Sequence, residues 1–142
     1  MTRPYSPTIV VGAIASAATA GALIAIGHRS GGAGVVFAAI ASAIGRSGGH
    51  AFVGVVVHTL VIFLWSAICV RLAMRVRSQV LAAVLVAIAN FLVSTVIASS
   101  SGRGLASELT LGDRVLYAVV LTASLIVGMR YAFLHSRETA TS

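Results

Sequence analysis

Residues 51–70 read AFVGVVVHTLVIFLWSAICV, twenty residues without a single Asp, Glu, Lys or Arg. An α-helix of this length rises about 30 Å, which is the thickness of the hydrocarbon core of a bilayer. The segment therefore predicts a transmembrane helix, and the rest of the chain is interpreted outward from it.

Three other segments have the same length and character. They are residues 9–27 (IVVGAIASAATAGALIAIG), 80–99 (VLAAVLVAIANFLVSTVIAS) and 115–133 (VLYAVVLTASLIVGMRYAF). Residues 33–44, AGVVFAAIASAI, would reach only about 18 Å as a helix, so we expect a short interfacial or re-entrant helix between the first two spans. The sequence predicts an all-α fold, an integral membrane four-helix bundle that forms a single transmembrane domain over residues 1–142.

The composition assigns the class of protein before any motif is considered. Of the 142 residues, 58% are hydrophobic and 9% are charged, whereas a soluble domain carries roughly 25% charged residues. The mean hydropathy of +1.03 agrees. Because the excess apolar surface must face lipid, the first predicted partner is the lipid bilayer. The net charge of +7 comes from arginines spread between apolar segments, a pattern of topology signals rather than of a nucleic-acid-binding surface.

The arginines also predict the orientation of the chain. With four spans, the two termini and the connection RLAMRVRSQ at 71–79 share one side of the membrane. That side carries about six of the ten arginines, so we expect both termini in the cytoplasm of a bacterial cell with the chain in the inner membrane; an inverted or dual insertion is the alternative. The predicted headgroup anchors are Arg71, Arg75, Arg77 and Arg130. Arg130 lies about one turn from the end of its span, so its side chain can extend to the headgroups.

The first span has a competing interpretation as a cleaved signal peptide. It follows a basic start and contains small residues, Ala-Thr-Ala, at 18–20. The apolar segment is long for a signal peptide, and the segments that follow are themselves apolar. We favour a retained helix.

Small residues recur every four positions on the first span, in two sets. One set is Ala13, Ala17, Gly21 and Ala25, and the other is Gly12, Ser16 and Ala20. Such small residues let helix backbones approach closely in a membrane. The favoured interpretation is packing within the bundle, and the alternative is a homo-oligomer contact.

Few polar side chains lie within the spans, and His58 and Asn90 are the candidate site. Both lie near the middle of adjacent antiparallel spans, which predicts an intramembrane polar pair. The favoured role is an interhelical hydrogen bond that fixes helix register. The alternative is a proton relay or a substrate contact by His58, because imidazole changes its charge near neutral pH. Tyr117 and Tyr131 are expected as anchors near the membrane surfaces.

The motifs of metal-dependent and nucleotide-binding enzymes are absent from the sequence. It contains no HExxH, CxxC or Walker motif, and no carboxylate lies within a span. The sequence therefore predicts no catalytic residues, no cofactor and no metal site. In the connection before the fourth span, Thr110 or Asp113 is expected to cap the helix.

Two stretches carry a family resemblance. They are IASAIGRSGGHAFVGVVVHTLVIFLWSAI at 40–68 and GDRVLYAVVLTASLIVGMRYAF at 112–133. They resemble a family of uncharacterised small four-helix bacterial inner-membrane proteins. The resemblance implies a four-helix membrane protein in which His58 matches the helical His of the family, and it implies no activity.

The predicted function is a multi-pass membrane protein that acts as a non-enzymatic structural or accessory component, with a homo-oligomer or another membrane protein as partner. This hypothesis rests on abundant small-residue faces and scarce reactive groups. The alternative is a small oligomeric transporter or channel with a polar path through His58 and Asn90.

Overall fold

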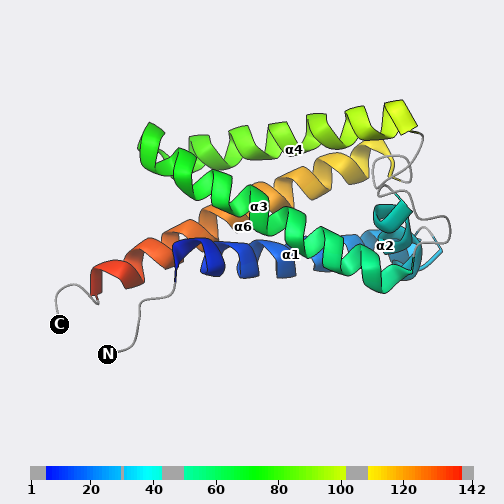
Figure 1. The fold of residues 1–142 in the computed structure, drawn as a ribbon, viewed down its shortest axis with the longest axis horizontal. Coiled ribbons are helices and arrows are strands. Elements are labelled where there is room, and N and C mark those ends of the chain that lie inside the picture. The colour runs from blue at the N-terminus through cyan, green and yellow to red at the C-terminus, as the bar shows by residue number, and fades with distance from the viewer. Residues whose placement is uncertain (1–5, 30, 43–49, 102–108, 139–142) are drawn as a thin grey trace.

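The computed structural model describes residues 6–29, 31–42, 50–101 and 109–138. Within these residues the chain forms five helices (Figure 1): α1 (Pro7–Arg29), α2 (Ala33–Ser42), α3 (Ala51–Val76), α4 (Gln79–Ser101) and α6 (Leu111–Glu138). Four of them, α1, α3, α4 and α6, are long and apolar enough to cross a membrane. The predicted all-α fold with four membrane-spanning helices is therefore confirmed.

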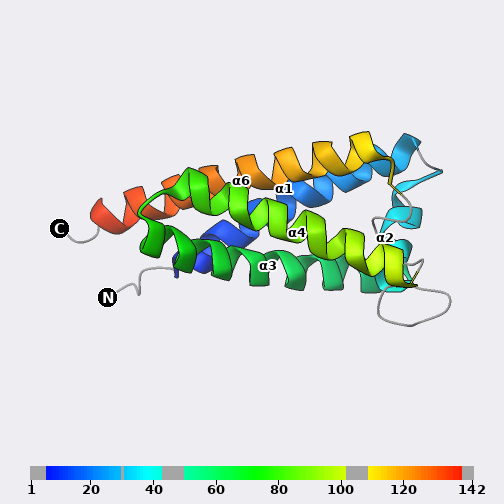
Figure 2. The ribbon, with the colours of Figure 1, turned by 90° about the horizontal axis from the view of Figure 1, so that it is seen from above.

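The four long helices run side by side, and the short α2 packs at one end (Figures 1 and 2). α1 packs against both α3 and α6, and α4 packs against the same two helices. α2 packs on α3 and α1. The start of α1 and the end of α6 lie together at the opposite end of the bundle from α2. We call the end with α2 the α2 end, and the other the terminal end.

The short helix between the first two spans is confirmed, and glycines explain its position. Gly31 and Gly32 have φ angles of +98° and +125°, in the region that favours glycine, and they turn the chain from α1 into α2. A Cβ added at Gly54 of α3 would overlap the backbone carbonyl oxygen of Phe37 on α2. Gly54 therefore permits the close crossing of α2 and α3. α2 ends at Ser42, and residues 43–44 of the predicted helix lie outside the described residues.

The predicted connection at 71–79 is mostly helix, which corrects the expected end of the second span at residue 70. α3 continues to Val76, because its last residues, RLAMRV, include good helix formers. The connection is only Arg77 and Ser78. Arg77 adopts a left-handed conformation with φ of 53°, and the Ser78 hydroxyl accepts a hydrogen bond from the backbone N–H of Leu81 at 3.2 Å. α3 and α4 therefore form a tight helical hairpin.

The two small-residue sets of α1 lie on different faces of the helix, about 100° apart. Gly12 and Ser16 are buried, and a Cβ at Gly12 would meet the ring of Phe63 on α3. In contrast, all four members of the other set are exposed: Ala13, Ala17, Gly21 and Ala25. The interpretation as packing within the bundle therefore applies to only one of the two sets.

α4 packs into the bundle mainly through its first half. Its buried side chains are Ala82, Ala83, Val86 and Ala87. From residue 88 to residue 99, none of the side chains that the structure describes is buried. Figure 1 shows α4 diverging from α3 toward the α2 end. The bundle is therefore closed at its terminal end and more open along the second half of α4.

Candidate functional site

His58 lies at the junction of four helices. It is on α3, one turn after Gly54, and its side chain is only 4% exposed. The imidazole Nε2 lies 3.0 Å from Oγ1 of Thr19 on α1. The ring packs edgewise against Phe37 of α2 and Tyr117 of α6, with centroid distances of 6.1 and 6.3 Å. One histidine thus contacts α1, α2 and α6.

The hydroxyl of Thr19 determines how His58 is bonded. It donates to the backbone carbonyl of Ala15 at 2.7 Å, so its oxygen is left to accept. Nε2 of His58 must then carry a proton and donate to Thr19; this tautomer is assigned from the hydrogen-bond network. The Thr19 hydroxyl thus donates within α1 and accepts from His58 of α3.

A second polar contact joins α1 and α3 beside the first. Ser16 Oγ donates to Thr59 Oγ1 at 3.4 Å, and Thr59 donates to the backbone carbonyl of Val55 at 2.9 Å. Ser16 and Thr19 are on one face of α1, and His58 and Thr59 are consecutive on α3. These hydroxyls and the imidazole together form what we call the polar junction. Interhelical hydrogen bonds of this kind fix the register of helices in lipid.

The structure does not bring His58 and Asn90 together. Asn90 is half-buried on α4, and in the described part of the chain it forms no hydrogen bond with His58. The reason is the length of α3. His58 lies 18 residues before Val76, about 27 Å of helix, whereas Asn90 lies 11 residues after Gln79, about 16 Å. Across the tight hairpin, the two side chains therefore differ in depth by about 10 Å.

Sequence reasoning missed Thr19 and misplaced Tyr117. Tyr117 is only 7% exposed and packs on His58, whereas we expected it at the membrane surface. Tyr131 is 51% exposed. Thr19 belongs to the polar face of α1 that includes Ser16, and its spacing of three residues from Ser16 was the available signal.

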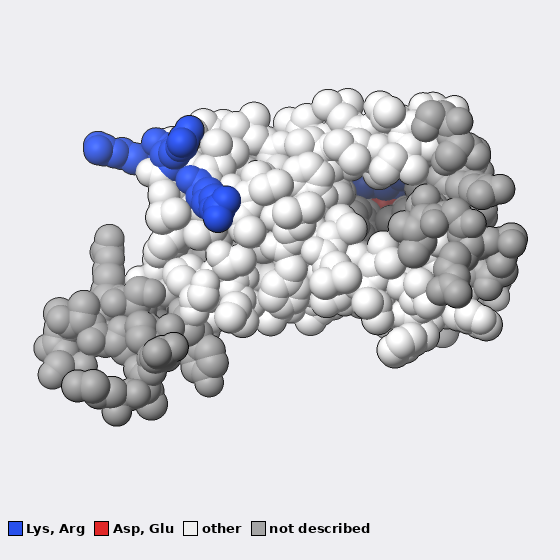
Figure 3. Space-filling view, in the orientation of Figure 1, with Lys and Arg blue, Asp and Glu red and all other residues white. Residues whose placement is uncertain are grey.

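The four predicted headgroup anchors lie at the terminal end. Arg71, Arg75, Arg77 and Arg130 are all exposed, and Figure 3 shows basic side chains gathered at this end. Arg71 and Arg75 belong to the part of α3 that extends beyond the predicted span. Their position is compatible with headgroup contacts, and that role stays a prediction.

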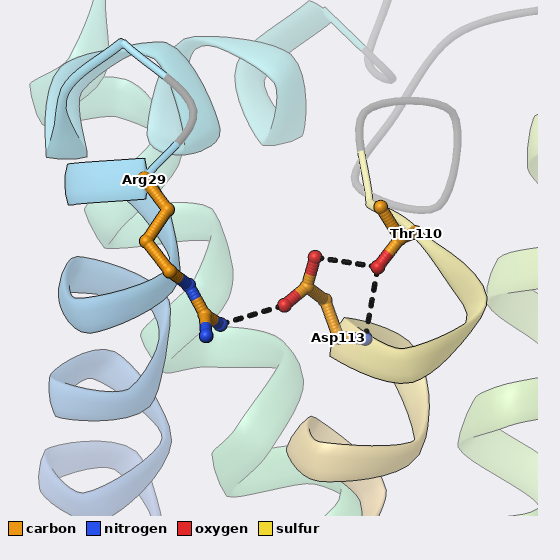
Figure 4. Close-up of polar contacts among 3 residues, drawn as sticks. All are labelled: Arg29, Thr110 and Asp113. Carbon is orange, nitrogen blue, oxygen red and sulfur yellow. Dashed lines mark hydrogen bonds and ion pairs between the residues drawn. The ribbon is translucent and has the colours of Figure 1, made fainter.

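At the α2 end, an ion pair and a helix cap join α1 to α6 (Figure 4). Thr110 is the cap: its hydroxyl accepts a hydrogen bond from the backbone N–H of Asp113 at 3.2 Å and donates to Asp113 Oδ2 at 2.7 Å. The other carboxylate oxygen, Oδ1, lies 2.7 Å from Nη2 of Arg29 at the end of α1. The sequence alone did not decide whether Thr110 or Asp113 is the cap, and it predicted no partner for Arg29.

The remaining polar atoms of the core offer little chemistry. Ser66 Oγ is buried without a hydrogen-bond partner, and Cys69 Sγ lies 3.8 Å from Met129 Sδ. Among the described residues, no three His, Cys, Asp or Glu side chains are grouped so that they could hold a metal ion. The hydrogen bonds of the described core thus join helices to one another, chiefly through Thr19, His58 and Ser16.

The fold and the polar junction define an α-helical multi-pass membrane protein with buried interhelical hydrogen bonds. Comparison with protein-family models, with curated proteins and with solved structures gives no match for this chain. The family resemblance described from the sequence therefore stays a prediction.

Proposed function

We propose that this protein is a non-enzymatic structural or accessory component of a bacterial inner membrane, and that the exposed face of α1 binds a second membrane-embedded chain. The contact would be helix against helix, within the hydrocarbon core. The partner is either another copy or a different membrane protein.

The exposed small residues of α1 carry this proposal. Ala13, Ala17, Gly21 and Ala25 recur every four positions on one face, and a Cβ added at Gly21 would meet nothing within 4 Å. In lipid, helices associate through close packing of small residues, because acyl chains are as apolar as leucine. The adjacent face of α1 packs by the same principle inside the bundle, where a Cβ added at Gly12 would meet the ring of Phe63.

The polar junction supports the structural interpretation over a transporter. A transport path needs polar groups that can release one partner and bind the substrate. The Nε2 proton of His58 is donated to Thr19, and the Thr19 proton is donated to the backbone carbonyl of Ala15, so both protons are already engaged. Asn90, the other residue of the hypothetical path, lies at a different depth.

The orientation follows from charge. Among the described side chains, the arginines at the terminal end are Arg71, Arg75, Arg77 and Arg130, and those at the α2 end are Arg29 and Arg114. Arginine-rich ends stay in the cytoplasm. The proposal therefore places both termini there. The packing of α1 against α3 and α6 favours a retained first helix.

The test is the association state in liposomes. The chain, labelled with one fluorophore, is reconstituted at high dilution, and photobleaching steps are counted for the wild type, for Gly21→Leu and for Ala17→Leu with Gly21→Leu. We expect wild-type dimers or higher oligomers and mostly monomers for the double variant. If the wild type is monomeric, a different partner is tested by affinity purification from native membranes. The wild type and the double variant are purified in parallel, and the proteins that co-purify with each are compared.

The control is Val93→Leu, which enlarges an exposed residue of α4, a helix that packs on α3 and α6. It should keep the wild-type association. The proposal fails if the double variant associates as the wild type does and also retains every co-purifying membrane protein. It also fails if Val93→Leu disrupts association as strongly as the α1 substitutions do.

A further inference from the structure

Two cavities follow one another between α4 and α6. The larger has a volume of about 430 Å³ and is lined by apolar residues such as Val84 and Phe91 of α4. The smaller, about 280 Å³, lies at the terminal end and is lined by Gln79, Arg130, Phe133 and Leu134. On α6 the lining residues lie on one continuous face, with steps of three or four: Val115, Val119, Thr122, Ile126, Arg130 and Phe133. We call this the α4–α6 groove.

The lining of the groove extends away from the terminal end on both helices. On α4 it runs from Gln79 to Phe91, about 18 Å along the helix, close to the half-thickness of about 15 Å of a hydrocarbon core. On α6 it runs from Val115 to Leu134, about 28 Å. The wide part of the groove is walled by Val, Ile, Ala and Phe side chains, with Thr122 as the polar exception. Its hydroxyl donates to the backbone carbonyl of Ala118 at 2.8 Å and so presents no free proton to the groove.

The charge of the groove is concentrated at its terminal end. Arg130 lines the smaller cavity, and Gln79 is the first residue of α4. The start of a long helix carries a partial positive charge from its backbone N–H groups, which favours an anion. Gln79 adds a neutral amide that can donate a hydrogen bond. The smaller cavity thus combines a guanidinium, an amide and a helix start, and the apolar cavity continues from it.

We propose that the α4–α6 groove binds one anionic phospholipid from the leaflet at the terminal end. Its phosphate contacts Arg130 and Gln79, and an acyl chain lies along the apolar part between Val84 and Phe91. The guanidinium at one end and the apolar lining beyond it match the charge distribution of an anionic phospholipid, whereas an apolar transmembrane helix of a partner would offer no anion to Arg130. The site is separate from the exposed face of α1 and does not depend on the function proposed for that face.

Native mass spectrometry of the full chain released from detergent tests the site. Phosphatidylglycerol and phosphatidylcholine with identical acyl chains are added in turn, and the fraction of protein that retains one lipid is measured. We expect the wild type to retain phosphatidylglycerol preferentially. Arg130→Gln should weaken that binding about fivefold, the effect of one arginine near a headgroup, and leave phosphatidylcholine binding unchanged.

Two further variants separate this site from its alternatives. Arg75→Gln removes the same charge from an exposed position at the same end, outside the groove, and should weaken phosphatidylglycerol binding much less than Arg130→Gln does. Ala123→Trp fills the apolar part and should reduce binding of both lipids, with helical content checked by circular dichroism.

The proposal is overturned if Arg130→Gln binds phosphatidylglycerol as the wild type does, or if Arg75→Gln weakens it equally, which would indicate diffuse attraction only. It is also overturned if Ala123→Trp retains both lipids but changes the oligomeric state, because the groove would then be a protein contact. Inorganic phosphate at millimolar concentration should not displace the lipid; displacement would indicate a simple anion site.

Discussion

The two sides of the bundle are packed by different means. On the side of α1, small residues and hydrogen bonds bring helices into close contact: a Cβ at Gly128 of α6 would lie 3.0 Å from Cα of Val11, and Thr19 bonds to His58. On the other side, the second half of α4 has no buried side chain among those described, and the apolar α4–α6 groove lies next to it. The difference teaches that apolar side chains alone do not bring helices into close contact in lipid. Acyl chains are equally apolar and can replace the neighbouring helix.

The largest expected effect is at the closest backbone contact. Gly54→Ala places a Cβ against the Phe37 carbonyl, so α2 must move, and we expect a loss of about 2 to 3 kcal/mol in the free energy of unfolding. The measurement is unfolding in mixed micelles with increasing SDS, followed by circular dichroism. Gly21→Ala is the control, since its Cβ meets open space, and should change stability by less than about 0.5 kcal/mol. Equal effects of the two substitutions would contradict the crossing of α2 and α3.

The next effect is at the polar junction. Thr19→Val keeps the shape of the side chain but removes the acceptor for His58, and we expect a loss of about 1 to 2 kcal/mol. Thr95→Val is the matched control on α4, where the hydroxyl donates only within its own helix, to Phe91 at 2.8 Å. A double-mutant cycle with His58→Phe should show coupling. Strictly additive losses from Thr19→Val and His58→Phe would mean that the two side chains do not interact.

The smallest effects are at the α2 end, where α1 and α6 are joined. Thr110→Ala removes the cap that bonds Asp113, at an expected cost of about 1 kcal/mol. Arg29→Gln should cost at most about 0.5 kcal/mol, because 63% of the Arg29 side chain is exposed and water screens the ion pair. Added salt should abolish the loss from Arg29→Gln and leave the loss from Thr110→Ala unchanged. A larger loss for Arg29→Gln than for Thr110→Ala would show that the ion pair, rather than the cap, holds this end.

The sequence predicts the positions of the helices well and their rotation poorly. Length and apolar character locate each span, since a helix in lipid must cross about 30 Å. The rotation depends on which face packs inward, and a helix that is apolar all round gives no periodic signal. For this reason the sequence could not distinguish the buried set of α1, with Gly12 and Ser16, from the exposed set with Gly21.

The sequence identifies His58 of the candidate site but not its partner, because the depth of each residue in the membrane is also hard to predict. His58 is conspicuous in any apolar segment, but its partner depends on depth, and depth depends on where α3 ends. An arginine-rich helix end and an arginine-rich loop have similar composition, so residues 71–76 were assigned to a loop. This error placed Asn90 level with His58.

The hairpin of α3 and α4 constrains how the chain enters the membrane. Arg77 and Ser78 are the only residues between the two helices, and even fully extended they span about 7 Å. That reach is about a quarter of the hydrocarbon thickness, so the end of α3 and the start of α4 must lie at the same surface of the membrane. Reversing one of the two helices in the bilayer would therefore require reversing both.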